Sequence, residues 1–292
     1  MNRHCLVQGP DKPVKVGDDA PLVVIAGPCV LEEPATQDRI AQTLREACDA
    51  AGLALVFKAS FDKANRTSIA SPRGPGLDSG LDELRRIRET YGVPVTTDVH
   101  EPEQARAAAE VVDILQIPAF LCRQTDLLLA AGEAAARHGC AVNVKKGQFL
   151  SPREMIGPVG KLAGTGCRNL ILTERGTFFG YHRLVTDLIG LGDLMELEVD
   201  GLAPPVCFDC THSAQLPGES ATTGGRRERI PLLARAAVAA GVPAVFMECH
   251  PDPAMSRSDA GTILPLGEVP DLLHLLARLH AMVREAATTP AR

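Results

Sequence analysis

A group of basic residues gives the first indication of chemistry in this sequence. Its members stand at or just beyond the ends of short apolar runs, in a chain whose formal net charge at pH 7 is −6. They are Lys58, Lys63, Arg66, Arg123, Lys145, Lys146 and Arg175. A buried lysine needs a partner, and the forked guanidinium group of arginine matches a phosphate. The group as a whole therefore indicates a phosphorylated substrate.

Two other interpretations of these cations remain open. Each cation, taken singly, is explained equally well by a neighbouring carboxylate such as Asp62, Asp98 or Glu174. Lys58 or Lys145 would also be suited to form a Schiff base with a carbonyl substrate.

A second set of residues has the chemistry of metal ligands. It consists of Cys29, His212, Glu248 and Asp259. One thiolate, one imidazole and two carboxylates form a mixed site that suits zinc, iron, manganese or cobalt. Because these residues are far apart in the chain, they favour by themselves a simpler interpretation, in which Cys29 belongs to the core and the others are ordinary polar residues.

A third set is suited to acid–base catalysis. Asp98, His100, Asp209 and His250 lie at the ends of apolar runs. Each of them has a side chain that positions a water molecule or transfers a proton.

All three sets depend on the arrangement of eight short apolar runs. These runs span residues 23–29, 55–63, 93–100, 114–120, 141–146, 169–175, 205–212 and 244–250. Segments with helical spacing lie between or after them, at 36–51, 78–91, 101–111, 126–138, 152–162, 181–190, 226–240 and 268–286. Alternating strands and helices predict parallel pairing, and eight units predict a TIM (β/α)8 barrel with one active mouth. An open doubly wound sheet is the alternative, although no GxGxxG motif follows the first run.

The chain length indicates how this barrel is organised. We expect residues 1–292 to form a single (β/α)8 domain, with residues 1–20 as a short cap at the closed end of the barrel. Three long polar loops occupy residues 66–76, 176–182 and 215–227. The third is rich in Gly and Ser, which is typical of a mobile lid.

Composition excludes several classes of function. The acidic net charge argues against a general nucleic-acid or membrane binder, and no run of 18 or more apolar residues predicts a membrane span. The first residues lack the apolar stretch of a secretory signal. The nine scattered cysteines predict a reducing, cytoplasmic setting. Cys207 and Cys210 form a CxxC motif, but within a strand their side chains would point to opposite faces, which disfavours a redox or zinc site.

Several longer motifs carry a resemblance to a known family. They include KASFDKANRTS at 58–68, TTDVHEPEQA at 96–105, DILQIPAFLCRQTDLLLAA at 113–131, NVKKGQFLSP at 143–152, LTERGT at 172–177 and THSAQLPG at 211–218. The chain closely resembles the 3-deoxy-D-manno-octulosonate 8-phosphate synthases from about residue 23 to residue 266. The related 3-deoxy-arabino-heptulosonate 7-phosphate synthases typically have a KPRT-type segment in place of KANRTS.

The resemblance implies a condensation of phosphoenolpyruvate with arabinose 5-phosphate and water, which releases phosphate and feeds the lipopolysaccharide core. It implies that phosphoenolpyruvate is held by Lys58, Ser60, Lys63, Lys145 and Arg175. The sugar phosphate would be held by Asn65, Arg66 and Thr67, with Gln116 also at the substrate site and Arg123 arriving from a neighbouring subunit of a homotetramer. The expected catalytic residues are Lys63, Asp98, His212 and Cys29.

The resemblance also raises the metal interpretation above the simpler one. Cys29, His212, Glu248 and Asp259 match the ligands of the metal-dependent branch, whereas another branch has Asn at the position of Cys29 and works without metal. The chain departs from the family at Thr67, Ala70, Pro72, His182 and Arg183, and in a short insertion around residues 132–139. Activity on erythrose 4-phosphate and non-catalytic binding of a sugar phosphate are the alternative functions.

Overall fold

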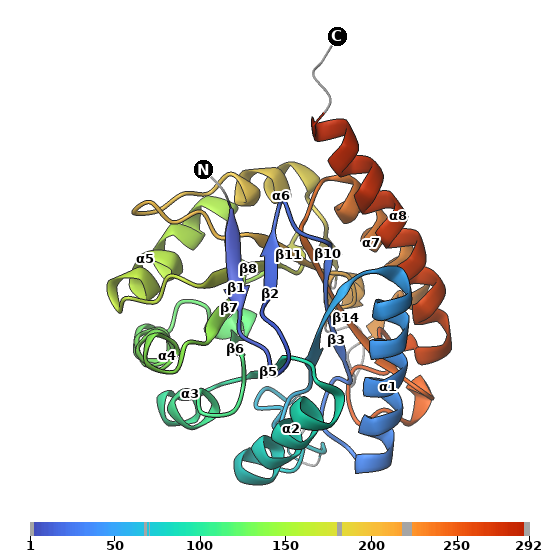
Figure 1. Ribbon diagram of the computed structural model, residues 1–292. Helices are drawn as coiled ribbons and strands as arrows, with labels where there is room; N and C mark the ends of the chain where they lie inside the picture. Colours follow the sequence, from blue (N-terminus) through green and yellow to red (C-terminus); the bar gives the residue numbers. More distant parts are fainter. Residues whose placement is uncertain (1–2, 67–68, 70, 180–182, 218–223, 289–292) are drawn as a thin grey trace.

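Eight parallel strands close into a barrel with helices on its outside (Figure 1). The computed structural model describes residues 3–66, 69, 71–179, 183–217 and 224–288. The barrel strands are β3 (Val23–Gly27), β4 (Ala54–Lys58), β5 (Val95–Asp98), β6 (Ile114–Ile117), β7 (Ala141–Lys145), β8 (Leu170–Glu174), β11 (Val206–Asp209) and β14 (Ala244–His250). Each strand pairs in parallel with the next, and β14 pairs with both β11 and β3. The predicted TIM barrel is therefore confirmed.

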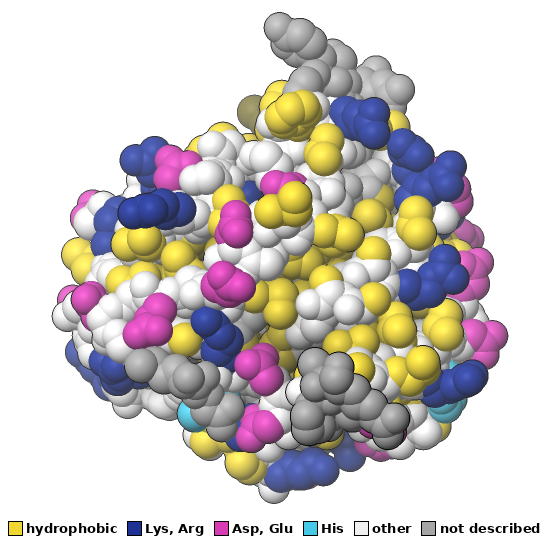
Figure 2. All heavy atoms as spheres, turned by 90° about the horizontal axis from the view of Figure 1, so that it is seen from above, with side chains coloured by type: hydrophobic (Ala, Val, Ile, Leu, Met, Phe, Trp, Pro, Cys, Tyr) yellow, Lys and Arg dark blue, Asp and Glu magenta, His cyan; other side chains and the backbone are white. Residues whose placement is uncertain are grey.

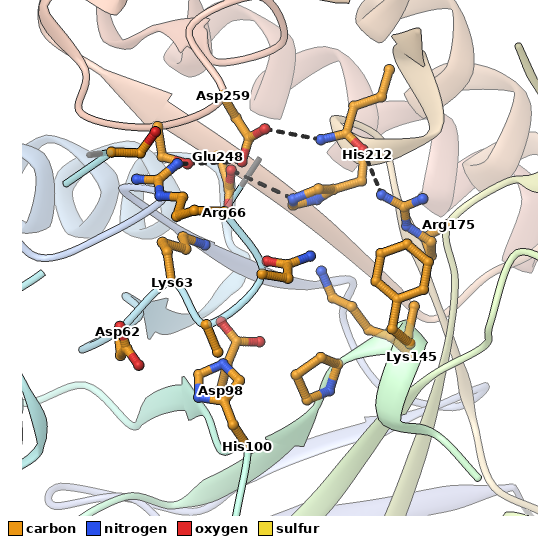
Figure 3. A pocket seen from close by; sticks show the side chains of 18 of the residues that line it. Asp62, Lys63, Arg66, Asp98, His100, Lys145, Arg175, His212, Glu248 and Asp259 are labelled. Carbon is orange, nitrogen blue, oxygen red and sulfur yellow. Dashed lines mark hydrogen bonds and ion pairs between the residues drawn. The ribbon is translucent and has the colours of Figure 1, made fainter. Parts of the chain in front are cut away.

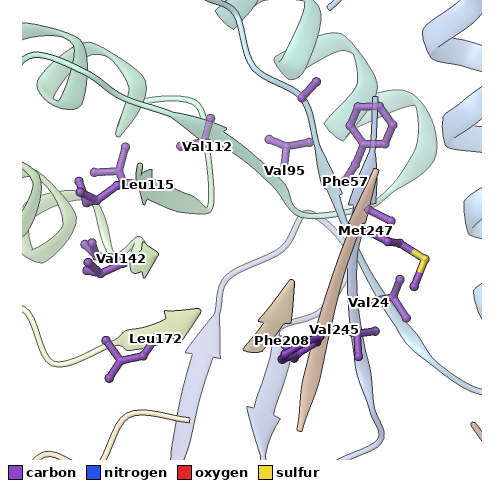
Figure 4. Packing of buried hydrophobic residues seen from close by; sticks show 14 of the residues in the cluster. Val24, Phe57, Val95, Val112, Leu115, Val142, Leu172, Phe208, Val245 and Met247 are labelled. Atoms are coloured by element: carbon purple, nitrogen blue, oxygen red, sulfur yellow. The ribbon is translucent and has the colours of Figure 1, made fainter. Parts of the chain in front are cut away.

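The barrel strands are buried on both faces, which explains their near-continuous apolar sequences. Alternate residues point outward to the helices and inward to the barrel axis. On the outer side, Val24, Val142 and Leu172 belong to the large core cluster between strands and helices (Figure 4). On the inner side, Ile25 and Ile171 belong to a second, smaller cluster that fills the barrel.

Eight helices cover the outer side of the barrel in the described part of the chain. They are α1 (Pro34–Ala51), α2 (Leu77–Tyr91), α3 (Pro102–Ala108), α4 (Thr125–His138), α5 (Ile156–Gly164), α6 (Leu188–Met195), α7 (Ile230–Ala239) and α8 (Val269–Thr288). Gly92 and Gly139 end α2 and α4 and adopt left-handed backbone conformations, which glycine reaches without a steric penalty.

Three of the predicted helix positions need correction. The predicted helix over 152–162 begins too early, since Pro152–Met155 is a 3-10 turn and α5 starts at Ile156. The predicted helix over 181–190 is wrong: Leu184–Val185 forms strand β10, and α6 begins later, because the Asp187 side chain caps it by accepting from the amide of Ile189. The predicted helix over 226–240 begins too early: Arg227–Arg229 is a 3-10 turn, and α7 starts at Ile230, where a proline stands in the first turn.

An antiparallel hairpin precedes the barrel. Strands β1 (His4–Val7) and β2 (Val14–Gly17) pair with each other. Their side chains Cys5, Val7 and Val16 are fully buried and pack with the interior residues of the barrel strands. These partners include residues near the amino ends of the strands, such as Val23 and Ala244. The hairpin therefore packs against the amino end of the barrel interior.

Short antiparallel ribbons and 3-10 turns elaborate the opposite end. One ribbon joins β9 (Thr177–Phe178) to β10, and another joins β12 (Gln215–Leu216) to β13 (Gly224–Gly225), while β15 (Leu264–Pro265) extends β14. The predicted lid over 215–227 is thus a two-stranded ribbon at its base, and its residues 218–223 lie outside the described part of the chain.

Among the described residues, no helix is both long and apolar enough to cross a membrane. All nine cysteines are buried and unpaired. Cys207 on β11 packs in the barrel interior and Cys210, one residue beyond that strand, packs in the outer core, so the two side chains of the CxxC motif do point to opposite sides.

Candidate active site

A cavity of about 760 Å³ opens at the carboxyl ends of the barrel strands. Its lining is rich in charge and draws on most of the strand ends and the loops that follow them (Figure 3). The basic lining residues are Lys58, Lys63, Arg66, Lys145, Arg175 and Arg257, and the acidic ones are Asp62, Asp98, Glu248 and Asp259. Counted over the described residues, the barrel therefore brings six cations and four carboxylates, distant in sequence, around one space.

An aromatic ring lies beneath two of these cations. The Nζ atom of Lys145 is 3.6 Å from the ring centroid of Phe246, and that of Lys58 is 5.6 Å from it. Phe246 is fully buried on β14. Each lysine is also neutralised: Lys58 Nζ lies 2.6 Å from Glu248 Oε1, and Lys145 Nζ lies 2.7 Å from Asp209 Oδ2. Each buried lysine thus has a carboxylate partner and an aromatic face beside it, which offset the cost of removing it from water.

Three other cations of the cavity have no carboxylate partner among the described residues. Lys63 donates to the hydroxyl of Ser60 at 3.1 Å. Arg175 donates from Nη2 to the amide oxygen of Gln215 at 2.7 Å, and its buried Nη1 has no partner. Arg66 donates to the Ser258 hydroxyl at 2.8 Å and to two carbonyl oxygens. The alternative that every cation pairs with a carboxylate accounts for Lys58 and Lys145 but not for these three.

His212 is oriented by a buried carboxylate. Its Nδ1 lies 2.7 Å from Asp209 Oδ2, and Asp209 Oδ1 accepts from the backbone amides of Thr211 and His212. Burial alone would raise the pKa of Asp209, but His212, Lys145 and Arg175 hold it well below its usual range. The carboxylate therefore holds the His212 ring through Nδ1, and Nε2 is the ring nitrogen that lies toward Glu248.

Ligand atoms of Cys29, Glu248 and Asp259 all lie within 4.8 Å of one another. The Cys29 thiol donates to Asp259 Oδ2 at 3.1 Å, and His212 Nε2 lies 3.7 Å from Glu248 Oε2. Burial alone would raise the pKa of Glu248, but Lys58, His212 and Lys63 lower it to about 2. The predicted metal ligands therefore meet at one edge of the cavity, three as a compact group and His212 beside them.

Asp98 projects into the cavity from the end of β5. Its two carboxylate oxygens accept from the Ser60 hydroxyl and from Gln116 Nε2, the latter at 2.6 Å. Burial alone would raise the pKa of Asp98, but Lys58, Lys63 and Lys145 lower it, so the group stays ionised. Ser60 and Gln116 themselves are fully buried and are not among the described residues that line the cavity.

The remaining predicted residues occupy varied places. Asn65 and His100 line the cavity, whereas Lys146 is buried outside it and bonds to Leu150 O and Glu174. Arg123 is exposed and is not among the described lining residues of its own cavity. The Nδ1 atom of His250 lies within hydrogen-bond distance of the backbone oxygen and nitrogen of Asp252.

Of the positions that differ from the family pattern, Thr67, Ala70 and His182 lie outside the described residues. Pro72 lines the cavity, Arg183 is exposed, and the short insertion falls in the second half of α4.

Sequence reasoning missed several lining residues. Gln148, Gln215, Arg257 and Ser258 contribute polar groups to the cavity. Gln215 links Arg175 to Asp259, to which it donates at 3.1 Å. Gln148 and Gln215 stand inside the quoted motifs NVKKGQ and THSAQL, so their position in those motifs was the available signal. Arg257 and Ser258 follow β14 in a loop whose HPDP motif ends at Pro253, so they stand outside the motifs.

Comparisons with known proteins agree with this geometry. The model of the DAHP synthetase I family matches residues 6–285. A 2-dehydro-3-deoxyphosphooctonate aldolase of Syntrophotalea carbinolica is 50% identical over 272 residues, which is 93% of this chain and 95% of that protein. Proteins with the same name from Granulibacter bethesdensis and Nitratidesulfovibrio vulgaris are 50% and 53% identical, over 92% and 89% of this chain and 93% and 92% of their own lengths.

Proposed function

The chain belongs to the DAHP synthetase I family, and we propose that it is a 2-dehydro-3-deoxyphosphooctonate aldolase acting in the synthetic direction. The reaction joins phosphoenolpyruvate, arabinose 5-phosphate and water, and it yields the phosphorylated eight-carbon keto acid and inorganic phosphate. The product would enter the biosynthesis of the lipopolysaccharide core.

The observation that best supports this function is the set of three cations without carboxylate partners, Lys63, Arg66 and Arg175, around one cavity. A buried arginine with a free donor is stabilised by an anion in the cavity. Arg66 is half-buried in the loop after β4, whereas Arg175 is buried directly after β8, so the two residues would hold two phosphates at separate places of the cavity. Both reactants of the proposed reaction carry a phosphate.

The residues have separate tasks in this proposal. Phosphoenolpyruvate is held by Lys58, Ser60, Lys63, Lys145 and Arg175. Asn65, Arg66 and Thr67 hold the phosphate of the sugar. Holding both reactants brings C3 of phosphoenolpyruvate against the sugar aldehyde and replaces a rare encounter by an oriented one.

The bond changes are then balanced as follows. The C3 carbon forms a bond to the aldehyde carbon, whose oxygen takes a proton, and C2 becomes electron-poor. A water molecule adds to C2 and loses a proton to a base. Asp98 is ionised and faces the cavity, and His212 also lines the cavity, so both are suited to manage these protons. The C2 hydroxyl then loses its proton and becomes the keto group, while the bond between C2 and the bridging oxygen breaks and phosphate leaves with that bond's electron pair.

We also propose that a divalent metal ion, zinc, iron, manganese or cobalt, is bound by Cys29, His212, Glu248 and Asp259. The residues fit such an ion: Glu248 Oε2 is buried without a hydrogen-bond partner, and Asp209 orients the His212 ring as carboxylates do for metal ligands. When bound, the ion would act as a Lewis acid that polarises an oxygen of a reactant. The side chains of the protein keep the site dry and hold the donor atoms together.

A second copy of this chain is proposed to cover one face of the barrel. Exposed apolar side chains collect on the loops after β6, β7 and β8 and on α5 and α6. They are Phe120, Phe149, Ile156, Phe178, Phe179, Leu188 and Ile189. Figure 2, which views the α6 side of the molecule, shows exposed hydrophobic groups among scattered charges. A surface of this kind is typical of subunit contacts.

Arg123 stands exposed beside this apolar face, immediately after the turn that carries Phe120. We propose a homotetramer in which Arg123 reaches the active site of a neighbouring subunit. A cytoplasmic setting fits the nine unpaired cysteines.

A phosphate-release assay tests the function. Release is expected with phosphoenolpyruvate and arabinose 5-phosphate together and with neither alone, and the rate with erythrose 4-phosphate should be far lower. No release with both substrates present would leave a non-catalytic sugar-phosphate binder. Borohydride trapping of Lys58 or Lys145 would instead support a Schiff-base aldolase.

A further inference from the structure

A row of polar side chains crosses the barrel interior directly beneath the cavity. Asp98 on β5, Gln116 on β6 and Asn143 on β7 are immediate neighbours in the strand register. Interior layers of such barrels are mostly filled by branched apolar side chains, as they are here in the layer of Ile114 and Ile171. A polar layer at this depth must therefore satisfy its own hydrogen bonds.

The bonds in this row all run in one direction. The Thr173 hydroxyl donates to Asn143 Oδ1 at 2.7 Å. Asn143 Nδ2 donates to Gln116 Oε1 at 3.0 Å, and Gln116 Nε2 donates to Asp98 Oδ1 at 2.6 Å. Gln116, Asn143 and Thr173 are at most 1% exposed, so water does not compete for these contacts. The row forms a relay that ends on the carboxylate of Asp98.

The carboxylate end of the relay sets its direction. An ionised carboxylate has only acceptor atoms, so Gln116 has to turn its Nε2 to Asp98 Oδ1. Gln116 Oε1 then faces Asn143 and accepts from its Nδ2, which leaves Asn143 Oδ1 to accept from the Thr173 hydroxyl. The amide groups of Asn143 and Gln116 are thereby fixed with their NH2 ends toward Asp98.

We propose that Thr173 and Asn143 are positioning residues for Asp98 and act on it through Gln116. The proposal rests on the proposed function, in which Asp98 manages a proton during condensation. If the amide of Gln116 turned over, its oxygen would face the Asp98 carboxylate and repel it. The relay excludes that orientation and holds Oδ1, so that Asp98 keeps one rotamer between Ser60 and the reactants. Gln116 accordingly positions Asp98 instead of binding substrate, since both ends of its amide are engaged.

The test compares Thr173→Val, which removes the hydroxyl at constant shape, with Thr173→Ser, which keeps it. We expect Thr173→Val to lower kcat about tenfold while KM for each substrate stays within about twofold, and Thr173→Ser to restore kcat to within about threefold of wild type. Thr97→Val is the matched control, because Thr97 is equally buried on β5 but its hydroxyl has no hydrogen-bond partner among the described residues. The control should keep the wild-type kcat.

The outcomes separate this inference from the proposed function. An inactive wild-type enzyme would overturn the function itself. An active wild type with an unchanged kcat in Thr173→Val would overturn the relay alone. A loss of kcat that Thr173→Ser does not restore would also overturn it, because it would reveal a packing role. If Thr173→Val does not fold, Thr173→Ala replaces it in the test, because it removes the same hydroxyl. The same loss of kcat is then expected for Thr173→Ala.

Discussion

At the scale of single residues, the site depends on cations that the protein leaves without carboxylates. Arg175 is the clearest case, because its side chain is 5% exposed and, among the described residues, makes one hydrogen bond to a neutral amide and has no partner for its Nη1. Burial lowers the pKa of this guanidinium, although Asp209 and Asp259 oppose the shift, and arginine remains charged. A bound phosphate would supply the missing partner.

Replacing Arg175 with lysine should therefore impair the enzyme although the charge is kept. The single ammonium group cannot reproduce a forked contact, and we expect kcat/KM for phosphoenolpyruvate to fall by about 10- to 100-fold. Steady-state kinetics with arabinose 5-phosphate at saturation measures this change. Arg106→Ala is the control, since Arg106 is exposed on α3 and pairs only with Glu103 among the described residues. Wild-type kinetics in Arg175→Lys would contradict the assignment.

Cys29 should decide whether the protein retains metal. We expect purified wild-type protein to contain close to one divalent ion per chain by elemental analysis, and a chelator such as dipicolinate to remove both the ion and the activity. Cys29→Ala should bind the ion far more weakly, because it loses one donor of the compact group. Cys48→Ala, at another buried and unpaired cysteine on α1, should keep the ion. Full activity in metal-free wild-type protein would refute the metal assignment.

The residue-level site was only partly predictable from sequence. The strand ends supplied Lys58, Lys145, Arg175 and Glu248, because apolar runs that stop at polar residues mark the mouth of a barrel. The pairing of these residues was not predictable, since Lys145 meets Asp209 across the barrel interior and not a carboxylate near in sequence.

At the scale of elements, the barrel was predictable because its strands carry an unbroken apolar signal. The helix before β11 was misplaced for a local reason. Residues 183–187 contain β-branched side chains that favour the short strand β10, and Asp187 is a better start signal than the earlier residues. The packing of the β1–β2 hairpin against the barrel interior was also not predictable from the sequence. Each strand has only four residues, and an alternation of apolar and polar residues over so short a run does not indicate a packing partner.

The hairpin should be sensitive to buried charge. Val16 is fully buried against the barrel interior, so Val16→Asp should destabilise the protein by about 3 kcal/mol or more. Chemical denaturation measures the difference in the free energy of unfolding. Lys12→Asp places the same charge at an exposed position of the turn between β1 and β2 and should cost little. Equal stability of the two variants would show that the hairpin does not close the barrel.

Helix α8 carries a histidine whose protonation opposes folding. His280 is buried and lies 3.2 Å from the carbonyl oxygen of Ala20, and burial lowers its pKa below the ordinary value near 6.5. Below that value the unfolded chain binds a proton that the folded chain does not, so stability should fall as pH decreases through it. Thermal melts between pH 8 and pH 5 test this. His280→Gln should flatten the dependence, and an identical pH profile in that variant would refute the assignment.

At the scale of the whole molecule, the apolar face over the loops after β6, β7 and β8 predicts assembly. Ile189 is 81% exposed on α6, an unusual place for a large aliphatic side chain in a lone subunit. Ile189→Arg should shift the protein to a smaller species in light scattering after size-exclusion chromatography, and activity should fall with it. Met282→Arg, at a comparably exposed apolar residue on α8, should leave the assembly intact. Loss of assembly in both variants would show that the effect is not specific to this face.

The packing of the hairpin into one end of the barrel has a consequence for the order of events. Because the hairpin fills the amino end of the barrel, reactants enter and leave only at the carboxyl ends of the strands. The reactant that binds deeper in the cavity therefore has to bind before the other. Lys145 and Arg175 lie deep and are nearly inaccessible, whereas Asn65 lies exposed near the rim. We therefore expect ordered binding, in which phosphoenolpyruvate binds first. The bound sugar phosphate then blocks the dissociation of phosphoenolpyruvate until the reaction is complete.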